Sequence, residues 1–125
     1  MESLDRRYCE RFEVPGAQVL YKLNQGVCAR TQLKNITKSS VRFEIKHDAK
    51  PGDFVELEIQ IPRKERICAK GNIVWISNSK PPYYSVVQFL AFSTDKRYNS
   101  LECLEQLKRV EAEYFLANEE YAPTR

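Results

Sequence analysis

The chain has 125 residues, 42% of them hydrophobic and 30% charged, which is typical of a single globular domain and excludes a disordered chain. Its 20 basic and 17 acidic residues leave a net charge of only +3, which argues against a DNA-binding protein. No apolar run is long enough for a signal peptide or a membrane span, so we expect a cytoplasmic protein.

The first segment along the chain, residues 1–16, is a polar arm. It carries clustered charges, among them Arg6, Arg7 and Arg11, and it ends at Pro15 and Gly16, which stop regular structure. We expect a mobile or loosely docked N-terminal arm. Because the arm directly precedes a first strand, it is placed to fold back over the mouth of a barrel.

Residues 17–93 alternate between apolar and polar side chains with a period of two, as strands with one buried face do. We expect six strands, at about 17–23, 27–34, 40–46, 55–61, 67–76 and 83–92. The last two runs are more continuously apolar, so we expect them to be buried on both faces. Short turn-like breaks predict antiparallel hairpins, and six such strands close most easily into a barrel.

Residues 94–118 change to a period of three to four, which predicts an amphipathic C-terminal helix capped by Ser93, Thr94 or Asp95. Its expected apolar stripe contains Tyr98, Leu101, Leu104, Leu107, Val110 and Tyr114. A helix of this length extends past a small barrel, which would leave Tyr114, Phe115 and Leu116 facing water. We therefore expect self-association or a partner contact through residues 110–121. The alternative is a helix that bends back or frays after Val110.

The sequence contains no constellation typical of an enzyme or a metal site. There is no G-x-S-x-G nucleophile motif and no phosphate-binding loop, and Glu56 and Glu58 lie on the polar side of a strand. The single histidine, His47, lies in a charged turn, and the four cysteines form no C-x-x-C pair. We expect no catalytic residue, no metal and no cofactor, and four reduced thiols.

Two polar features could bind a ligand. The first is Arg6-Arg7-x-x-x-Arg11, because a guanidinium donates two parallel hydrogen bonds to phosphate and stacks on a flat base. The second is the turn Asn35-Ile36-Thr37-Lys38-Ser39-Ser40, where Asn35 and Thr37 would project to one face if the chain is extended. Taken singly, the first is also typical of a solvated arm and the second of an ordinary polar hairpin turn.

Together these features resemble the PilZ family, whose pattern is a double Arg followed by a third Arg, a first strand, and a [DN]-x-S-x-x-G turn. Further segments agree in order, and the resemblance runs from about Arg6 to Leu107. These segments are Pro51-Gly52-Asp53, Ile61-Pro62, Lys70-Gly71-Asn72-Ile73-Val74-Trp75 and Ser85-Val86-Val87-Gln88-Phe89.

The resemblance implies a fold, a ligand and a binding site. The fold is mainly β, a six-stranded antiparallel barrel of the split-barrel type with a long C-terminal helix. The ligand is the bacterial second messenger cyclic di-GMP, and binding at the arm would be relayed to a protein effector in motility or biofilm control. The implied binding residues are Arg6, Arg7, Arg11, Asn35, Thr37 and Ser40. In this pattern Arg7 and Arg11 grip phosphates and guanines, Arg6 favours an intercalated ligand dimer, and Asn35 and Thr37 bond a guanine.

Three positions depart from the family pattern. Thr37 replaces serine, while Ser40 and Ser85 replace glycines. If the backbone at position 40 needs a positive φ, the serine costs roughly 1–2 kcal/mol; if a base lies against that backbone, the side chain crowds it. The alternative function is therefore a PilZ-like protein-interaction module that binds no nucleotide and acts in pilus, flagellar or secretion control.

Overall fold

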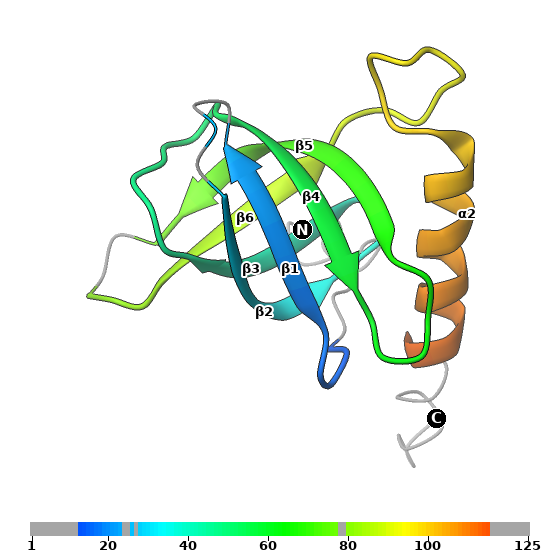
Figure 1. Ribbon diagram of the computed structural model, residues 1–125, viewed down its shortest axis with the longest axis horizontal. Helices are drawn as coiled ribbons and strands as arrows, with labels where there is room; N and C mark the ends of the chain where they lie inside the picture. The colour runs from blue at the N-terminus through cyan, green and yellow to red at the C-terminus, as the bar shows by residue number, and fades with distance from the viewer. Residues whose placement is uncertain (1–12, 24–25, 27, 78–79, 116–125) are drawn as a thin grey trace, which may run out of the picture.

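The computed structural model describes residues 13–23, 26, 28–77 and 80–115, which form a β-barrel with one helix beside it (Figure 1). The strands are β1 (Gln18–Leu23), β2 (Cys28–Ile36), β3 (Ser40–Ile45), β4 (Phe54–Gln60), β5 (Ile67–Ile76) and β6 (Tyr83–Phe89). They close in the order β1-β2-β3-β6-β5-β4, and each neighbouring pair is antiparallel. The predicted fold class, a six-stranded antiparallel barrel with a C-terminal helix, is confirmed.

The barrel interior is filled by the apolar residues of each alternating strand. In β1, for example, Val19, Tyr21 and Leu23 are buried, while the residues between them face outward. The rings of Tyr21 and Phe43 stack with their centroids 5.4 Å apart near the centre of the core. Each large side chain buried in this way contributes about 1.5–3 kcal/mol to folding. The period-two pattern therefore builds the core directly.

The expectation that the last two strands are buried on both faces is wrong for β5 and holds only for the middle of β6, where Ser85, Val86 and Val87 are all buried. In β5 the inward-facing Ile67, Ala69 and Ile73 are buried, but Val74 and Trp75 expose 48% and 44% of their surface. No other strand of the described residues covers the outer face at Val74 and Trp75, which explains their exposure.

Gly71 allows β5 and β6 to approach closely. A Cβ atom at this position would lie 2.5 Å from the carbonyl oxygen of Gln88 and 2.6 Å from Cγ1 of Val87. No side chain fits in that space, so the two strands could not keep their register with any other residue here.

The helix begins later than the sequence pattern predicts. It comprises α2 (Leu101–Val110) and a π-helical turn, η1 (Glu111–Phe115). Ser100 is the N-cap, because its Oγ accepts a hydrogen bond from the Cys103 amide at 3.0 Å. The expected start near Thr94 is therefore wrong, and so is the early part of the expected stripe: Cys103, Leu107 and Val110 are buried, whereas Leu101 is 49% exposed.

Residues 93–99 form a loop that is fixed to β5 by Asn99. The buried side chain of Asn99 accepts a hydrogen bond from the Lys70 amide at 2.6 Å. Its amide nitrogen donates to the carbonyl oxygens of Lys70 at 2.9 Å and Leu90 at 3.0 Å. The side chain thus replaces strand-to-strand hydrogen bonds at the point where β6 has ended.

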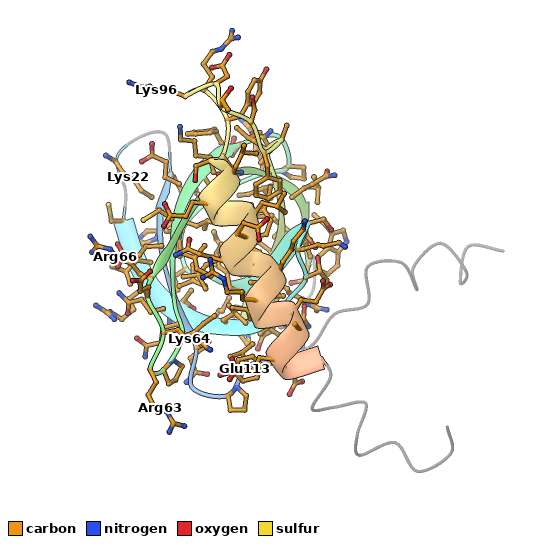
Figure 2. The ribbon with its side chains drawn as sticks, turned by 90° about the vertical axis from the view of Figure 1, so that its right-hand side faces the viewer. Lys22, Arg63, Lys64, Arg66, Lys96 and Glu113 are labelled. Carbon is orange, nitrogen blue, oxygen red and sulfur yellow. The ribbon has the colours of Figure 1, made fainter. Side chains whose placement is uncertain are left out.

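The far end of the helix also contacts the barrel. Lys64, in the hairpin between β4 and β5, forms an ion pair with Glu113 (Figure 2). Tyr114 is half-buried and packs against the core, so the expectation that it faces water is wrong. The side chain of Phe115 and all of Leu116 lie outside the described residues.

Candidate functional site

The turn between β2 and β3 is closed by the side chain of Thr37. Its Oγ1 accepts hydrogen bonds from the amides of Ser39 and Ser40, both at 3.0 Å. The Thr37 amide donates to the carbonyl oxygen of Ser40 at 2.8 Å, and Thr37 is only 1% exposed. The hydroxyl is therefore committed to the turn, as a Ser or Thr in such a motif often is.

Two β-bulges change the direction of side chains in the barrel. Each places on the outer face a residue that strict alternation would direct inward. One bulge lies between Leu33 and Asn35 in the pairing of β2 with β3, and the other between Ile73 and Trp75 in the pairing of β5 with β6. Leu33 and Ile73 are buried, as alternation predicts. Each bulge adds one residue, so Asn35 and Trp75 point outward instead.

Arg42 of β3 lies between the two bulged strands. Its register partners are Asn35 on β2 and Val86 on β6, and Trp75 is paired with Val86 on the far side. The Arg42 guanidinium carbon lies 5.4 Å from the centroid of the Trp75 ring and 5.5 Å from that of the Tyr84 ring. Val86 faces outward but is only 7% exposed, in keeping with its place between Arg42 and Trp75.

The same face carries polar atoms that lack a hydrogen-bond partner. Within the described part of the chain, Asn35 Oδ1 and Arg42 Nε are buried without one. A buried polar group left unpaired costs about 1–3 kcal/mol, and a ligand that pairs with these two atoms would remove that cost. Lys34 adds a further cation, with its Nζ 6.0 Å from the centroid of the Tyr84 ring. This face therefore combines a flat cation, two aromatic rings and a free acceptor.

The residues predicted from the sequence are only partly brought together. Arg6, Arg7 and Arg11 lie outside the described residues. Asn35 is on the outer face, and Ser40 begins β3 beside the turn. Thr37 lies beyond the end of β2 and is buried in the turn, so Asn35 and Thr37 do not share one strand face as expected.

Ser40 does not have the backbone conformation that would require glycine. Among the described residues other than glycine, only Arg63 has a positive φ. Backbone strain therefore does not disfavour serine at position 40, and crowding of a ligand by the side chain is the remaining reason to prefer glycine there. Ser85, the other replaced glycine, is fully buried, and its hydroxyl donates to the carbonyl oxygen of Phe43 at 3.4 Å.

Sequence reasoning missed three members of this face, Arg42, Tyr84 and Lys34. Arg42 and Tyr84 occupy outward-facing positions between the apolar residues of ordinary alternating strands, and in the sequence such positions are typical of solvated surface residues. The available signal was the ordered motif around Trp75, which placed an aromatic residue near the end of β5 but gave no indication of its direction.

Away from this face, Tyr21 and His47 have structural contacts, whereas the buried Thr31 Oγ1 has no hydrogen-bond partner among the described residues. Burial raises the pKa of Tyr21, whose hydroxyl accepts a hydrogen bond from the Lys46 amide at 2.9 Å and shares another with His47 Nδ1 at 3.0 Å. His47 is exposed, as expected of a surface histidine. Across the ranges that the structure describes, no cluster of three or more His, Cys, Asp or Glu could hold a metal ion. In the same ranges no helix is both long and apolar enough to cross a membrane.

Comparison with known proteins supplies a family match and structural neighbours. A sequence model of the PilZ domain matches residues 5–107. The PilZ domain of YcgR from Escherichia coli, solved with c-di-GMP, has a TM-score of 0.70 and 14% identity, and covers 96% of this chain and 99% of that chain. The comparison with curated proteins gives no match.

Two longer structures are also similar. YcgR from Escherichia coli in complex with c-di-GMP has a TM-score of 0.70, 18% identity and coverage of 96% of this chain and 51% of that chain. The Bacillus subtilis inhibitor of motility (MotI/DgrA) has a TM-score of 0.57, 13% identity and coverage of 83% and 51%. At these identities the likeness concerns the fold, and the chain spans about half the length of both proteins.

Proposed function

Since the chain belongs to the PilZ domain family, a family of receptor domains and not of enzymes, we propose that it binds cyclic di-GMP on the outer face that carries Asn35, Arg42, Trp75 and Tyr84. The observation that carries this proposal is the Arg42 guanidinium beside two aromatic rings and an unpartnered Asn35 oxygen. A purine base stacks on such planes and offers N–H groups to such an acceptor. The bound nucleotide of the similar YcgR domain supports the same ligand class.

The N-terminal arm supplies the phosphate contacts in this proposal. Arg7 and Arg11 bind the two phosphates of the ligand, and Arg6 favours a ligand dimer. Because the arm precedes β1, its closure over the ligand relays binding to a protein effector. Thr37 and Ser40 shape the turn against which one guanine lies.

Isothermal titration of the pure protein with cyclic di-GMP tests the proposal. We expect saturable binding, and at least a hundredfold weaker binding for Arg7→Ala and for Arg11→Ala, because each loses charge-assisted hydrogen bonds of about 1.5–3 kcal/mol apiece. Arg109→Ala is the matched control, since Arg109 is exposed on α2. Affinity should also fall as salt rises. A stoichiometry of two ligands per chain identifies the dimer.

A second candidate function is a protein-interaction module without nucleotide binding. The observation that favours it is Ser40, whose half-buried side chain occupies the position of the family's glycine, with its Oγ 3.4 Å from Thr37 Oγ1. No heat and no spectral change at high-micromolar cyclic di-GMP would exclude the first function and leave this second one.

A further inference from the structure

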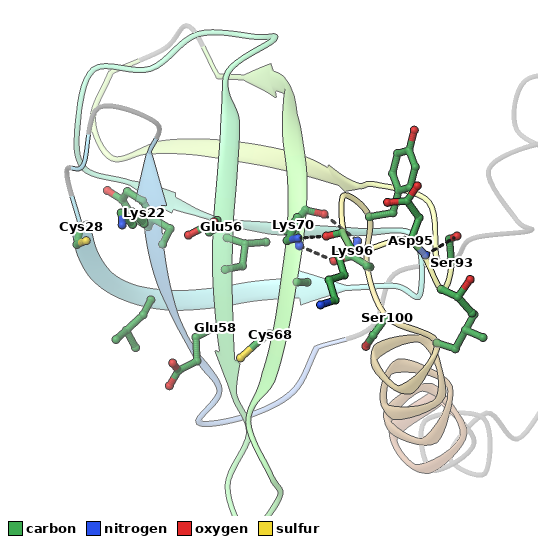
Figure 3. Close-up of a pocket in the computed structure, with 18 of the residues that line it drawn as sticks. Lys22, Cys28, Glu56, Glu58, Cys68, Lys70, Ser93, Asp95, Lys96 and Ser100 are labelled. Carbon is green, nitrogen blue, oxygen red and sulfur yellow. Dashed lines mark hydrogen bonds between the residues drawn. The ribbon is translucent and has the colours of Figure 1, made fainter.

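A groove of about 1060 Å³ lies on the surface formed by β2, β1, β4 and β5, beneath the loop of residues 93–99 (Figure 3). It does not include β3 or β6, which carry Arg42 and Tyr84, so it is separate from the candidate nucleotide face. The Asn99 side chain fixes the loop to β5, and the groove between loop and barrel is therefore preformed.

The groove exposes apolar side chains along its length. Tyr98 and Leu101, at the helix end, expose 39% and 49% of their surface, and both line the groove. Cys68 on β5 is exposed. It is the register partner of Glu58 on β4, which in turn is the register partner of Leu20 on β1, so the three residues lie side by side across the sheet. Exposed apolar groups gathered around a hollow are typical of a binding surface.

The charges around the groove favour an acidic occupant. Its lining contains Lys22, Arg30, Lys70 and Lys96 against Glu56, Glu58 and Asp95. Two of these carboxylates are already paired: Glu58 lies 3.9 Å from Arg66, and Asp95 lies 2.7 Å from Arg97. Arg66 and Arg97 do not line the groove themselves, so the four cationic side chains of the lining face one carboxylate, Glu56, that no described arginine or lysine pairs with. Lys22 and Lys96 form no ion pair with any described residue.

We propose that this groove docks a segment of a partner protein that presents carboxylates next to apolar side chains. The apolar side chains of the segment cover Tyr98, Leu101 and Cys68, and its carboxylates pair with Lys22 and Lys96. Charge complementarity of this kind selects the partner, while the buried apolar area supplies most of the affinity. The proposal does not depend on nucleotide binding.

Amide chemical-shift mapping on the full chain, without nucleotide, tests the proposal with three synthetic peptides of twelve residues. One contains Leu and Glu, the second Leu and Lys, and the third Ser and Glu. We expect only the Leu/Glu peptide to shift the amides of Cys68, Lys70 and residues 95–101, with a dissociation constant of about 10–500 µM. No groove shifts at millimolar Leu/Glu peptide, or equal shifts with the Leu/Lys peptide, would overturn the proposal.

Substitutions separate the charged and apolar parts of the surface. Lys22→Glu with Lys96→Glu should weaken binding of the Leu/Glu peptide at least tenfold, and Leu101→Ser at least threefold, without loss of fold because all three side chains are exposed. Arg109→Glu, on an exposed part of α2 outside the groove, is the matched control and should leave binding unchanged. Equal weakening by the control would show nonspecific charge attraction and contradict the proposal.

The groove could instead be occupied by the C-terminal segment of the same chain or by a second copy of the protein. Amide shifts of the full chain, recorded without peptide, test both. Residues 116–125 contain Glu119 and Glu120 next to Tyr121. If Glu119→Lys with Glu120→Lys moves the groove amides, the occupant is this segment of the chain itself and the partner proposal fails. Groove shifts that grow with protein concentration would identify a second copy, and the partner proposal would fail in that case as well.

Discussion

Trp75 is the only tryptophan of the chain, and it stands at the edge of the candidate nucleotide face with its ring against Arg42. A guanine that stacks on this face changes the surroundings of the indole. We therefore expect cyclic di-GMP to change the intensity of the tryptophan emission saturably, with the same midpoint as the heat of binding. Arg42→Ala should weaken binding about tenfold or more, because it removes the stacking plane and its donors.

Arg97→Ala is the control for Arg42, since Arg97 is exposed and contacts Asp95 and the Tyr98 ring within the loop of residues 93–99. Heat of binding without any change in Trp75 emission would place the ligand elsewhere on the barrel.

Ser40 gives a prediction on the turn. Ser40→Gly should preserve cyclic di-GMP affinity or improve it by about threefold to tenfold, because glycine removes the side chain that crowds a ligand against the turn. Relief of backbone strain is not the reason, since Ser40 has no positive φ. A clear loss of affinity in Ser40→Gly, measured by calorimetry, would mean that the serine itself contacts the ligand.

Cys103 makes stability depend on pH in the alkaline range. Burial raises the pKa of its thiol to about 11, from an ordinary value of 9.0. Below pH 9 the thiol is protonated in both the folded and the unfolded chain. As the pH rises from 9 to 11 the unfolded chain loses this proton first, so the free energy of unfolding falls by about 1–2 kcal/mol.

Urea unfolding of the wild type and of Cys103→Ala at pH 8 and pH 11 checks this sign. At pH 8 the variant should be less stable than the wild type, because the substitution leaves a small cavity. At pH 11 the difference in free energy of unfolding between the two proteins should be smaller, because only the wild type has lost the contribution of the buried thiol. An equal difference in free energy of unfolding at pH 8 and pH 11 would show that the pKa of the thiol is not raised as expected.

At the residue scale, the sequence predicted part of the candidate site. Asn35 and Ser40 were identified from the motif, and the structure places them at the outer face and at its edge. Arg42 was not identified, because nothing in an alternating strand distinguishes an arginine that lies over two rings from one in water. The outward direction of Trp75 depends on a bulge, and the alternation pattern does not reveal where one residue has been added.

At the scale of elements, glycine is required for one reason at Gly71 and for another at Gly52: close packing of two strands in the first case and a positive φ in the second. Gly71→Ala should destabilise the protein by about 3 kcal/mol, because the added Cβ meets the Gln88 carbonyl at 2.5 Å and the strands must move apart. Gly52 has a φ of +101° and open space around it, so Gly52→Ala should cost about 1–2 kcal/mol, from backbone strain alone. Urea unfolding measures both, and a Gly71→Ala variant as stable as the wild type would contradict the close packing of β5 on β6.

The strands were predictable from sequence and the helix start was not. Alternation located all six strands to within a few residues, because each has one face in the core. Ser93, Thr94 and Asp95 are all good capping residues, but the cap is Ser100. The loop before it is fixed by Asn99 hydrogen bonds to Lys70 and Leu90, and such long-range contacts leave no periodic signal in the sequence.

At the scale of the whole molecule, the expectation of self-association through residues 110–121 stays a prediction. The structure narrows it, because Val110 is 3% exposed and Tyr114 packs against the core of the same chain. Of the described residues from 110 to 114, only Ala112 and Glu113 are exposed enough to contribute to such an interface. Light scattering of the full chain over a hundredfold range of concentration measures self-association. A constant monomer mass would contradict the prediction.

The barrel is made of two three-stranded meanders, β1-β2-β3 and β4-β5-β6, joined along the seams β3–β6 and β1–β4. Within each meander all pairings are between consecutive strands, whereas the seams join strands about forty residues apart in sequence, as Phe43 with Ser85 and Tyr21 with Leu57. Loop closure makes such distant pairings the slow part of folding. Asn35 and Arg42 belong to one meander and Trp75 and Tyr84 to the other, so the candidate nucleotide face is assembled only when the two halves meet. In a refolding experiment, the ability to bind ligand should therefore be the last property to return, after hairpin structure has formed, and added ligand should slow unfolding more than it speeds refolding.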